Sequence, residues 1–318
     1  METDRGTVGA EAGPVVVEDP RMAGLVEPGT SVRRLGGDAT WSEGPVHLPA
    51  EDAVLWSDIP GNRILRWDER TATVSVERTD VEFTNGRTLD LQGRVVACSH
   101  GRRGLERTEP DGTTHLLVDS WRGVRFNSPN DVVVRSDGTI WFTDPAYGIV
   151  QAHEGHPGER EYGDHYVFRF DPATGDVRPV VIDVEEPNGL AFSPDEALLY
   201  VSDTAAALGR WGASNHHIRV YDVRDGSLCK NGRLFAEISP GLADGFRVDV
   251  HGNVWTSSED SVQVYGPDGV RLGRIPVPEP VGNLCFGGPD RSVLYIAATT
   301  GLYRFPTRTT GCSPLDLA

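Results

Sequence analysis

A β-hairpin unit recurs six times along the chain, and this repeat restricts the possible folds more than any other feature. Each unit begins with a residue that carries a side-chain oxygen, runs into a short apolar strand, turns, and returns in a second strand. The first residues of the units, called lead residues below, lie 39 to 58 residues apart. They are Glu43, Asn85, Asn130, Asn188, Asp244 and Asn283. A repeat of this length is typical of solenoids and propellers.

The repeat predicts an all-β fold, a six-bladed β-propeller with four-stranded blades. The sixth unit has only three strands before the chain runs out. We therefore expect its outer strand to come from residues 32–35, so that an N-terminal strand closes the ring. The predicted organisation is a loosely ordered extension over residues 1–30, a propeller over 31–308 and a tail over 309–318. Helix content should be small, because no segment shows a 3.6-residue apolar period.

Composition excludes several classes of partner and location. The chain has 30 basic and 47 acidic residues, a net charge of −17, which argues against nucleic acid and anionic membranes as partners. The N-terminus lacks a basic and apolar leader, and no long apolar run is present, so we expect a cytoplasmic protein. The sequence indicates no oligomeric state. The cysteines are scattered and predict neither a zinc site nor a disulfide framework. They are Cys98, Cys229, Cys285 and Cys312.

Hairpin geometry places the lead residues at one end of the propeller. In an antiparallel pair, the start of the first strand and the end of the second lie at the same end. First strands line the central channel, so the lead residues should gather at its mouth, with strand-end residues such as His100 and Asp144 on the same face. The longest connections, residues 145–163 and 204–215, also belong to this face. Long loops at one rim are commonly lids or substrate walls.

Four lead residues form an all-oxygen ligand set: the carboxylates Glu43 and Asp244 and the carboxamides Asn130 and Asn188. Two carboxylates placed close together destabilise each other's charged forms unless a cation lies between them. Oxygen ligands suit Ca²⁺, with Mg²⁺ or Mn²⁺ as substitutes, and four ligands leave positions open for water or substrate. For Asn85 and Asn283, a local turn-forming role is the favoured interpretation.

Several stretches resemble the gluconolactonase/regucalcin (senescence marker protein) family, most closely its bacterial gluconolactonase-like members. The resemblance covers about residues 31–307. Where a Cys-Glu-His-Gly stretch is usual in such members, this chain has Cys98-Ser99-His100-Gly101. The stretches that carry the resemblance are Trp41-Ser42-Glu43-Gly44-Pro45-Val46, Trp56-Ser57-Asp58-Ile59-Pro60, Asn127-Ser128-Pro129-Asn130-Asp131-Val132, Phe142-Thr143-Asp144-Pro145-Ala146-Tyr147-Gly148 and Pro187-Asn188-Gly189-Leu190.

The resemblance implies a six-bladed propeller with one divalent metal ion in its channel. Glu43, Asn188 and Asp244 match the family's metal ligands, and Asn130 matches a residue that ligates the metal or contacts substrate. Calcium is the expected ion, with magnesium, manganese and zinc as alternatives.

The resemblance also implies hydrolysis of a small lactone, such as the sugar lactone gluconolactone. Asp244 matches the residue often assigned as the catalytic base, although water activated by the cation itself is an equally physical nucleophile. We expect Arg125, His100 and Asp144, together with Asn130, to hold substrate hydroxyls. Two alternatives remain: an esterase or phosphotriesterase that uses the same metal site, and a non-catalytic calcium-binding propeller.

Overall fold

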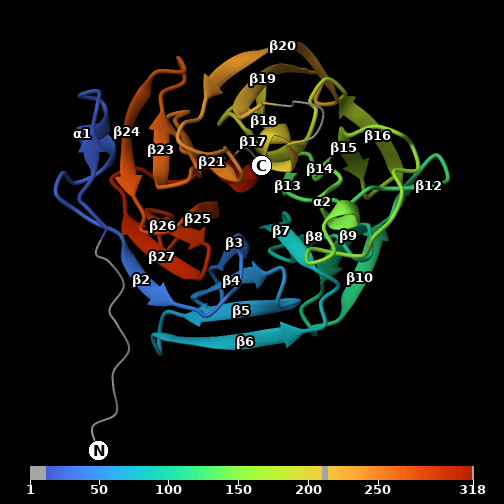
Figure 1. The fold of residues 1–318 in the computed structure, drawn as a ribbon, viewed down its shortest axis with the longest axis horizontal. Helices are drawn as coiled ribbons and strands as arrows, with labels where there is room; N and C mark the ends of the chain where they lie inside the picture. The colour runs from blue at the N-terminus through green and yellow to red at the C-terminus, as the bar shows by residue number, and fades with distance from the viewer. Residues whose placement is uncertain (1–11, 210–213, 317–318) are drawn as a thin grey trace, which may run out of the picture.

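Six sheets surround a common axis in the computed structural model, which describes residues 12–209 and 214–316 (Figure 1). Five of these sheets have four strands, and the remaining one has a fifth strand at its outer edge. The innermost strands of neighbouring sheets contact one another around the ring. The fold is therefore the predicted six-bladed β-propeller. No helix in the described part of the chain is long and apolar enough to cross a membrane.

Each blade is an antiparallel sheet whose first three strands follow one another in sequence from the axis outward. Blade one contains β3 (Ser42–Leu48), β4 (Ala53–Asp58), β5 (Arg63–Asp68) and β6 (Thr73–Thr79). Blade two contains β7 (Thr84–Leu89), β8 (Val95–Ser99), β9 (Gly104–Thr108) and β10 (Thr114–Val118). Blade three contains β13 (Val132–Val134), β14 (Ile140–Asp144), β15 (Tyr166–Asp171) and β16 (Asp176–Val181).

The second half of the ring repeats this arrangement. Blade four contains β17 (Pro187–Phe192), β18 (Leu198–Asp203), β19 (His217–Arg224) and β20 (Leu228–Glu237). Blade five contains β21 (Phe246–Val248), β22 (Val254–Thr256), β23 (Ser261–Tyr265) and β24 (Arg271–Pro276). Blade six contains β25 (Val281–Gly287), β26 (Val293–Ala298), β27 (Gly301–Pro306) and, as its outer strand, β2 (Arg33–Gly36).

The strand β2 closes the ring, as the missing fourth strand of blade six predicted. It pairs antiparallel with β27, with Arg33 opposite Arg304 and Arg34 opposite Tyr303. The closure joins segments from opposite ends of the chain and removes the free edge that β27 would otherwise present.

The N-terminal segment is more ordered than the sequence suggested. The strand β1 (Val16–Val17) adds a fifth strand to blade five by pairing with β24. After it, α1 (Met22–Leu25) inserts its apolar side into the core shared by blades five and six, where Met22 and Val26 are fully buried. The expectation of a loose extension is therefore wrong for this part, because its apolar residues find a core. Residues 1–11 lie outside the described residues.

The hydrophobic core is divided into clusters that lie between blades. Each of the six clusters draws residues from two neighbouring blades, for example Trp141 of blade three with Leu199 of blade four. Second strands supply the fully buried tryptophans Trp56, Trp141 and Trp255. Since every blade buries its faces against its neighbours, the stability of each blade depends on the intact ring.

Two short helices and a hairpin lie on the face that carries the lead residues. The connection from β14 to β15 contains α2 (Tyr147–Val150), and the connection from β18 to β19 contains the 3₁₀ helix η1 (Ala205–Leu208). A two-stranded hairpin, β11 (Ser120–Trp121) with β12 (Val124–Arg125), separates blades two and three. A further 3₁₀ helix, η3 (Pro314–Asp316), lies at the opposite end of the blades, where Asp316 pairs with Arg291 in the turn between β25 and β26.

Candidate active site at the channel mouth

Three blades hold their lead residues by the same device, an aspartate at the end of the second strand. The backbone amides of Asn127 and Ser128 donate to the two carboxylate oxygens of Asp144, both at 2.8 Å. In blade four, the amides of Glu185 and Glu186 bind Asp203 in the same way. The corresponding residue of blade one is Asp58, which accepts from Thr40 and Trp41. These clamp aspartates fix the chain two or three residues before Glu43, Asn130 and Asn188.

Glycines after the lead residues allow neighbouring first strands to approach closely. The Gly86 amide donates to the carbonyl of Asn130 at 2.8 Å, and the Gly189 amide donates to the carbonyl of Asp244 at 2.9 Å. A Cβ on Gly86 would lie 2.5 Å from the Asn130 carbonyl oxygen, and one on Gly189 would lie 2.3 Å from that of Asp244. No other residue fits there, so these glycines reflect inter-blade contact rather than turn geometry.

The lead residues open into a cavity of about 290 Å³ at the channel mouth. All four predicted ligands line it, and so does Asn85. Its remaining walls come from loops on the same face and mix aromatic, aliphatic and polar side chains. They are Trp41, Ile59, Tyr147, Gln151, Glu154, Thr204, Ala207, Gly241, Leu242, Ser258, Glu259, Pro280 and Val281.

Glu43 is buried in the cavity wall with only half of its carboxylate bonded. Its Oε2 accepts the Gly44 backbone amide at 2.9 Å, whereas Oε1 is buried and has no hydrogen-bond partner among the described residues. Burial raises the pKa of Glu43 to about 7, and the negative charges of Asp131 and Glu154 add to the effect. The free oxygen is available to a cation or to a hydrogen-bond donor.

Asp244 faces the same cavity and is half-buried. Its backbone amide donates to Ser257 Oγ at 2.7 Å, which fixes the start of blade five. Burial raises the pKa of Asp244 well above its usual value, and the charges of Glu43 and Glu154 raise it further. Asn188 only partly offsets this effect. The two carboxylates therefore oppose each other's ionisation across the cavity.

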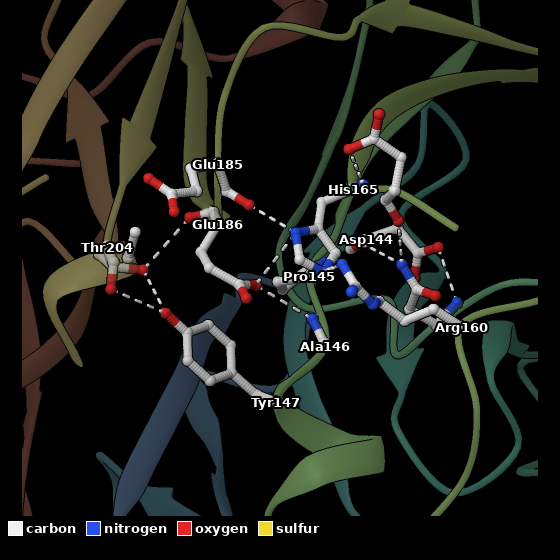
Figure 2. Close-up of polar contacts among 12 residues, drawn as sticks. Asp144, Pro145, Ala146, Tyr147, Arg160, His165, Glu185, Glu186 and Thr204 are labelled. Carbon is white, nitrogen blue, oxygen red and sulfur yellow. Dashed lines mark hydrogen bonds and ion pairs between the residues drawn. The ribbon is translucent and has the colours of Figure 1, made fainter. Parts of the chain in front are cut away.

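A hydrogen-bond chain orients the Asn188 side chain. Thr204 Oγ1 donates to the backbone carbonyl of Glu186 and accepts from Asn188 Nδ2 at 3.2 Å. The hydroxyl of Tyr147 meets the same Thr204 oxygen at 2.6 Å (Figure 2). Because the amide nitrogen of Asn188 is bonded to Thr204, its carbonyl oxygen is the atom left to meet a ligand in the cavity.

Behind this chain, Glu186 and His165 join blade four to the long loop of blade three (Figure 2). Glu186 Oε2 accepts the Ala146 backbone amide at 3.2 Å and faces His165 Nδ1 at 3.7 Å. Arg160 Nη1 meets the other ring nitrogen of His165 at 3.3 Å. These contacts hold the segment that carries Tyr147 against Thr204.

The site residues suit a divalent cation. No group of three or more His, Cys, Asp or Glu side chains is arranged to hold a metal ion in the described part of the chain. The predicted set instead combines two carboxylates with two carboxamides, which are the hard oxygen donors that Ca²⁺ accepts. The unpartnered Glu43 Oε1, the repulsion between Glu43 and Asp244, and the orientation of Asn188 all fit such an ion.

Comparison with known proteins places this architecture in one family. The family model of the SMP-30/gluconolactonase/LRE-like region matches residues 41–300. The chain belongs to this family. A gluconolactonase of Zymomonas mobilis is 29% identical over 326 aligned residues, which cover 95% of this chain and 88% of that relative. The pentonolactonase XacC of Haloferax volcanii is 31% identical, with 81% of each chain covered.

A solved structure supports the same assignment. The structure of a gluconolactonase from Xanthomonas campestris superposes with a TM-score of 0.85 at 37% identity, covering 96% of this chain and 100% of that one. The family resemblance found in the sequence motifs is thus confirmed.

Three residues predicted to contact substrate lie elsewhere in this family member. Arg125 is exposed on the β11–β12 hairpin, and its backbone amide donates to Glu161. Asp144 is fully buried as a clamp aspartate. His100 is fully buried behind Asn85 rather than in the cavity wall. Asp144 does lie at the end of its strand, and His100 directly follows the end of its own. That position does not determine whether a side chain turns toward the cavity or toward its own loop.

Other residues at the site were missed. Glu154 brings a further carboxylate to the cavity from the connection between β14 and β15, a segment without periodicity. Arg87 lies two residues after Asn85 and is fully buried, donating to the Gly44 carbonyl at 2.9 Å and to Ser57 Oγ at 2.7 Å. The sequence signal that could have identified Arg87 is its position, a charged residue two places after the lead residue Asn85. Trp211, which belongs to the connection over residues 204–215, lies outside the described residues.

Proposed function

We propose that this protein is a divalent-cation-dependent lactonase that opens a small sugar lactone. The observation that carries the proposal is the pair of carboxylates, Glu43 and Asp244, that line one cavity together with the carboxamide of Asn188. Membership of the family supports it, since relatives that cover most of the chain are named as gluconolactonase and pentonolactonase.

Glu43, Asn130, Asn188 and Asp244 would hold the cation, and calcium is the ion that this donor set favours. A bound divalent cation supplies Lewis-acid polarisation of the lactone carbonyl. The side chains would supply proton transfer. Asp244 is half-buried and borders the open part of the cavity, so a carboxylate oxygen can accept a proton from an attacking water molecule. Burial and the charges of Glu43 and Glu154 raise the pKa of Asp244, and a bound cation would oppose this shift and favour the ionised carboxylate that a general base requires.

The remaining cavity wall suits a polyhydroxylated ring. Trp41, Ile59 and Leu242 offer apolar surface, whereas Gln151 and Glu154 offer hydrogen-bond partners for hydroxyls. Gln151 and Glu154 therefore take the hydroxyl-binding role first assigned to Arg125, His100 and Asp144. A small pocket with a few convergent polar groups is the usual form of a small-molecule site.

A substrate panel tests the proposal. Purified protein is assayed with aldonolactones, aryl esters and organophosphate triesters, before and after removal of metal with a chelator. We expect hydrolysis of aldonolactones that is lost on chelation and restored by Ca²⁺. Preference for the triesters would favour a phosphotriesterase, and cation binding without hydrolysis of any substrate would favour a binding protein. Lactone hydrolysis unaffected by chelation would overturn the metal dependence alone.

A further inference from the structure

We propose that Asn85, the lead residue of blade two, supplies a further oxygen ligand to the cation, and that His100 holds it in the required orientation. The inference rests on the cation of the proposed function and adds a fifth residue to its ligand set. The sequence alone favoured a local turn-forming role for Asn85, so the assignment depends on contacts that only the structure contains.

The backbone of Asn85 is fixed between the lead residues of its neighbours. Ser57 Oγ donates to the Asn85 carbonyl at 3.1 Å, and the following Gly86 amide donates to the carbonyl of Asn130 at 2.8 Å. The Asn85 side chain lines the cavity beside Glu43 and Asn130, and the residue is only 3% exposed. It therefore occupies the same position in blade two that the proposed ligands occupy in theirs.

Hydrogen-bond chemistry determines which end of the Asn85 amide faces the cavity. His100 is fully buried and forms no ion pair with any described residue, so burial favours the neutral ring with one proton. Its Nδ1 lies 2.9 Å from the backbone carbonyl of Glu154, which can only accept, so the proton is on Nδ1. Nε2 must then accept, and the atom 3.2 Å from it is the Asn85 amide nitrogen. The carbonyl oxygen of Asn85 points the other way.

That oxygen is buried and has no partner. Asn85 Oδ1 accepts no hydrogen bond from any described residue, and Glu43 Oε1 in the same cavity is in the same condition. A buried oxygen left without a hydrogen-bond partner is energetically unfavourable, so such atoms in functional sites commonly meet a ligand. A cation satisfies both oxygens together and brings the ligand set closer to the six to eight oxygens that calcium prefers.

A second lead asparagine shows what a purely local role looks like. Asn283 in blade six is also buried, but its Oδ1 accepts the Leu284 backbone amide at 2.8 Å. Its oxygen is thus used within its own strand. The difference between Asn85 and Asn283 lies in His100, which binds the Asn85 nitrogen and leaves the oxygen free.

Calcium titration of metal-free protein by calorimetry, without substrate, tests the inference. We expect Asn85→Ala to weaken Ca²⁺ binding at least tenfold. Asn85→Asp, which keeps the shape and adds charge, should bind at least as tightly as wild type. Asn127→Ala is the matched control, because Asn127 is fully buried with an unpartnered Oδ1 but lies outside the cavity wall. It should lower the melting temperature and leave the calcium Kd within about twofold of wild type.

Specific outcomes would overturn the assignment. A calcium Kd for Asn85→Ala within twofold of wild type rules it out. If that variant does not fold, weaker binding by Asn85→Asp does the same. An unchanged calcium Kd with a raised KM for lactone would place Asn85 on the substrate instead. Wild-type protein that binds no calcium would remove the cation from the proposed function as well, whereas the other results leave that function intact.

Discussion

Buried carboxylates occur in two sets in this protein, and the two sets differ in their supply of hydrogen-bond donors. The clamp aspartate Asp203 accepts from the backbone amides of Glu185, Glu186 and Ala205 and from the Asn215 side chain. In the cavity, by contrast, Glu43 accepts one backbone amide and leaves Oε1 without a partner among the described residues. Both carboxylate oxygens of the clamp residue Asp203 thus accept hydrogen bonds, whereas one oxygen of Glu43 in the cavity accepts none from the described residues.

A raised pKa does not distinguish the clamp residue Asp144 from Glu43 in the cavity. Burial raises the pKa of the clamp residue Asp144 to about 7 despite its three hydrogen-bond donors, and it raises that of Glu43 as well. The difference lies in what surrounds the charge. Donors from Tyr162 and the backbone enclose Asp144, whereas Glu43 and Asp244 face each other across open space. An unpaired acidic pair at a cavity indicates a ligand, and a saturated one indicates structure.

The largest expected effect comes from removing the proposed base. Asp244→Asn keeps the size of the side chain and one oxygen ligand but cannot accept the proton, so kcat at saturating Ca²⁺ should fall by about 10²–10⁴-fold. Glu43→Gln is the matched control, because it removes the same charge without removing the base. Equal losses in steady-state assays of the two variants would mean that charge, rather than proton transfer at Asp244, controls the rate.

In metal-free protein, substitution in the clamp set should lower stability, whereas substitution in the cavity set should raise it. Asp203→Asn replaces an acceptor of backbone amides by a group that can donate, so it should destabilise the fold by about 1–3 kcal/mol. Asp244→Asn removes a half-buried charge that the charge of Glu43 opposes, so it should stabilise the metal-free fold. Urea denaturation at pH 8 measures both changes. Destabilisation of similar size in the two variants would show that Asp244 has a structural role like that of Asp203.

The last expected effect is on the pH dependence of stability. The folded-state pKa of Glu43 is about 7, raised from 4.5, so folded metal-free protein binds more protons than unfolded protein between these values. The contribution of Glu43 to the free energy of unfolding is therefore greatest at acidic pH and is lost as pH rises through this window. Urea midpoints from pH 4.5 to 8 should fall less steeply for Glu43→Gln than for wild type. Parallel curves would contradict the pKa shift.

The repeated hairpin was enough to predict the ring, its closure by residues 32–35 and the positions of the lead residues, because strand pairing fixes which end of a strand lies where. It could not assign strand-end side chains such as His100, since a side chain there can turn toward the cavity or toward its own loop. Glu154 was missed for a different reason. Its segment has no periodicity, and its place at the cavity depends on the bond from His100 to its carbonyl.

Closure of the ring by β2 has a consequence for synthesis of the protein. The partner of β2 spans Gly301–Pro306, so β2 leaves the ribosome long before the strand that it must pair with. At about 5–20 residues per second, the delay lasts tens of seconds. During that time the outermost strand offers two consecutive arginines, Arg33 and Arg34, which discourage pairing with a wrong edge. Blade six is thus completed only when nearly the whole chain is available.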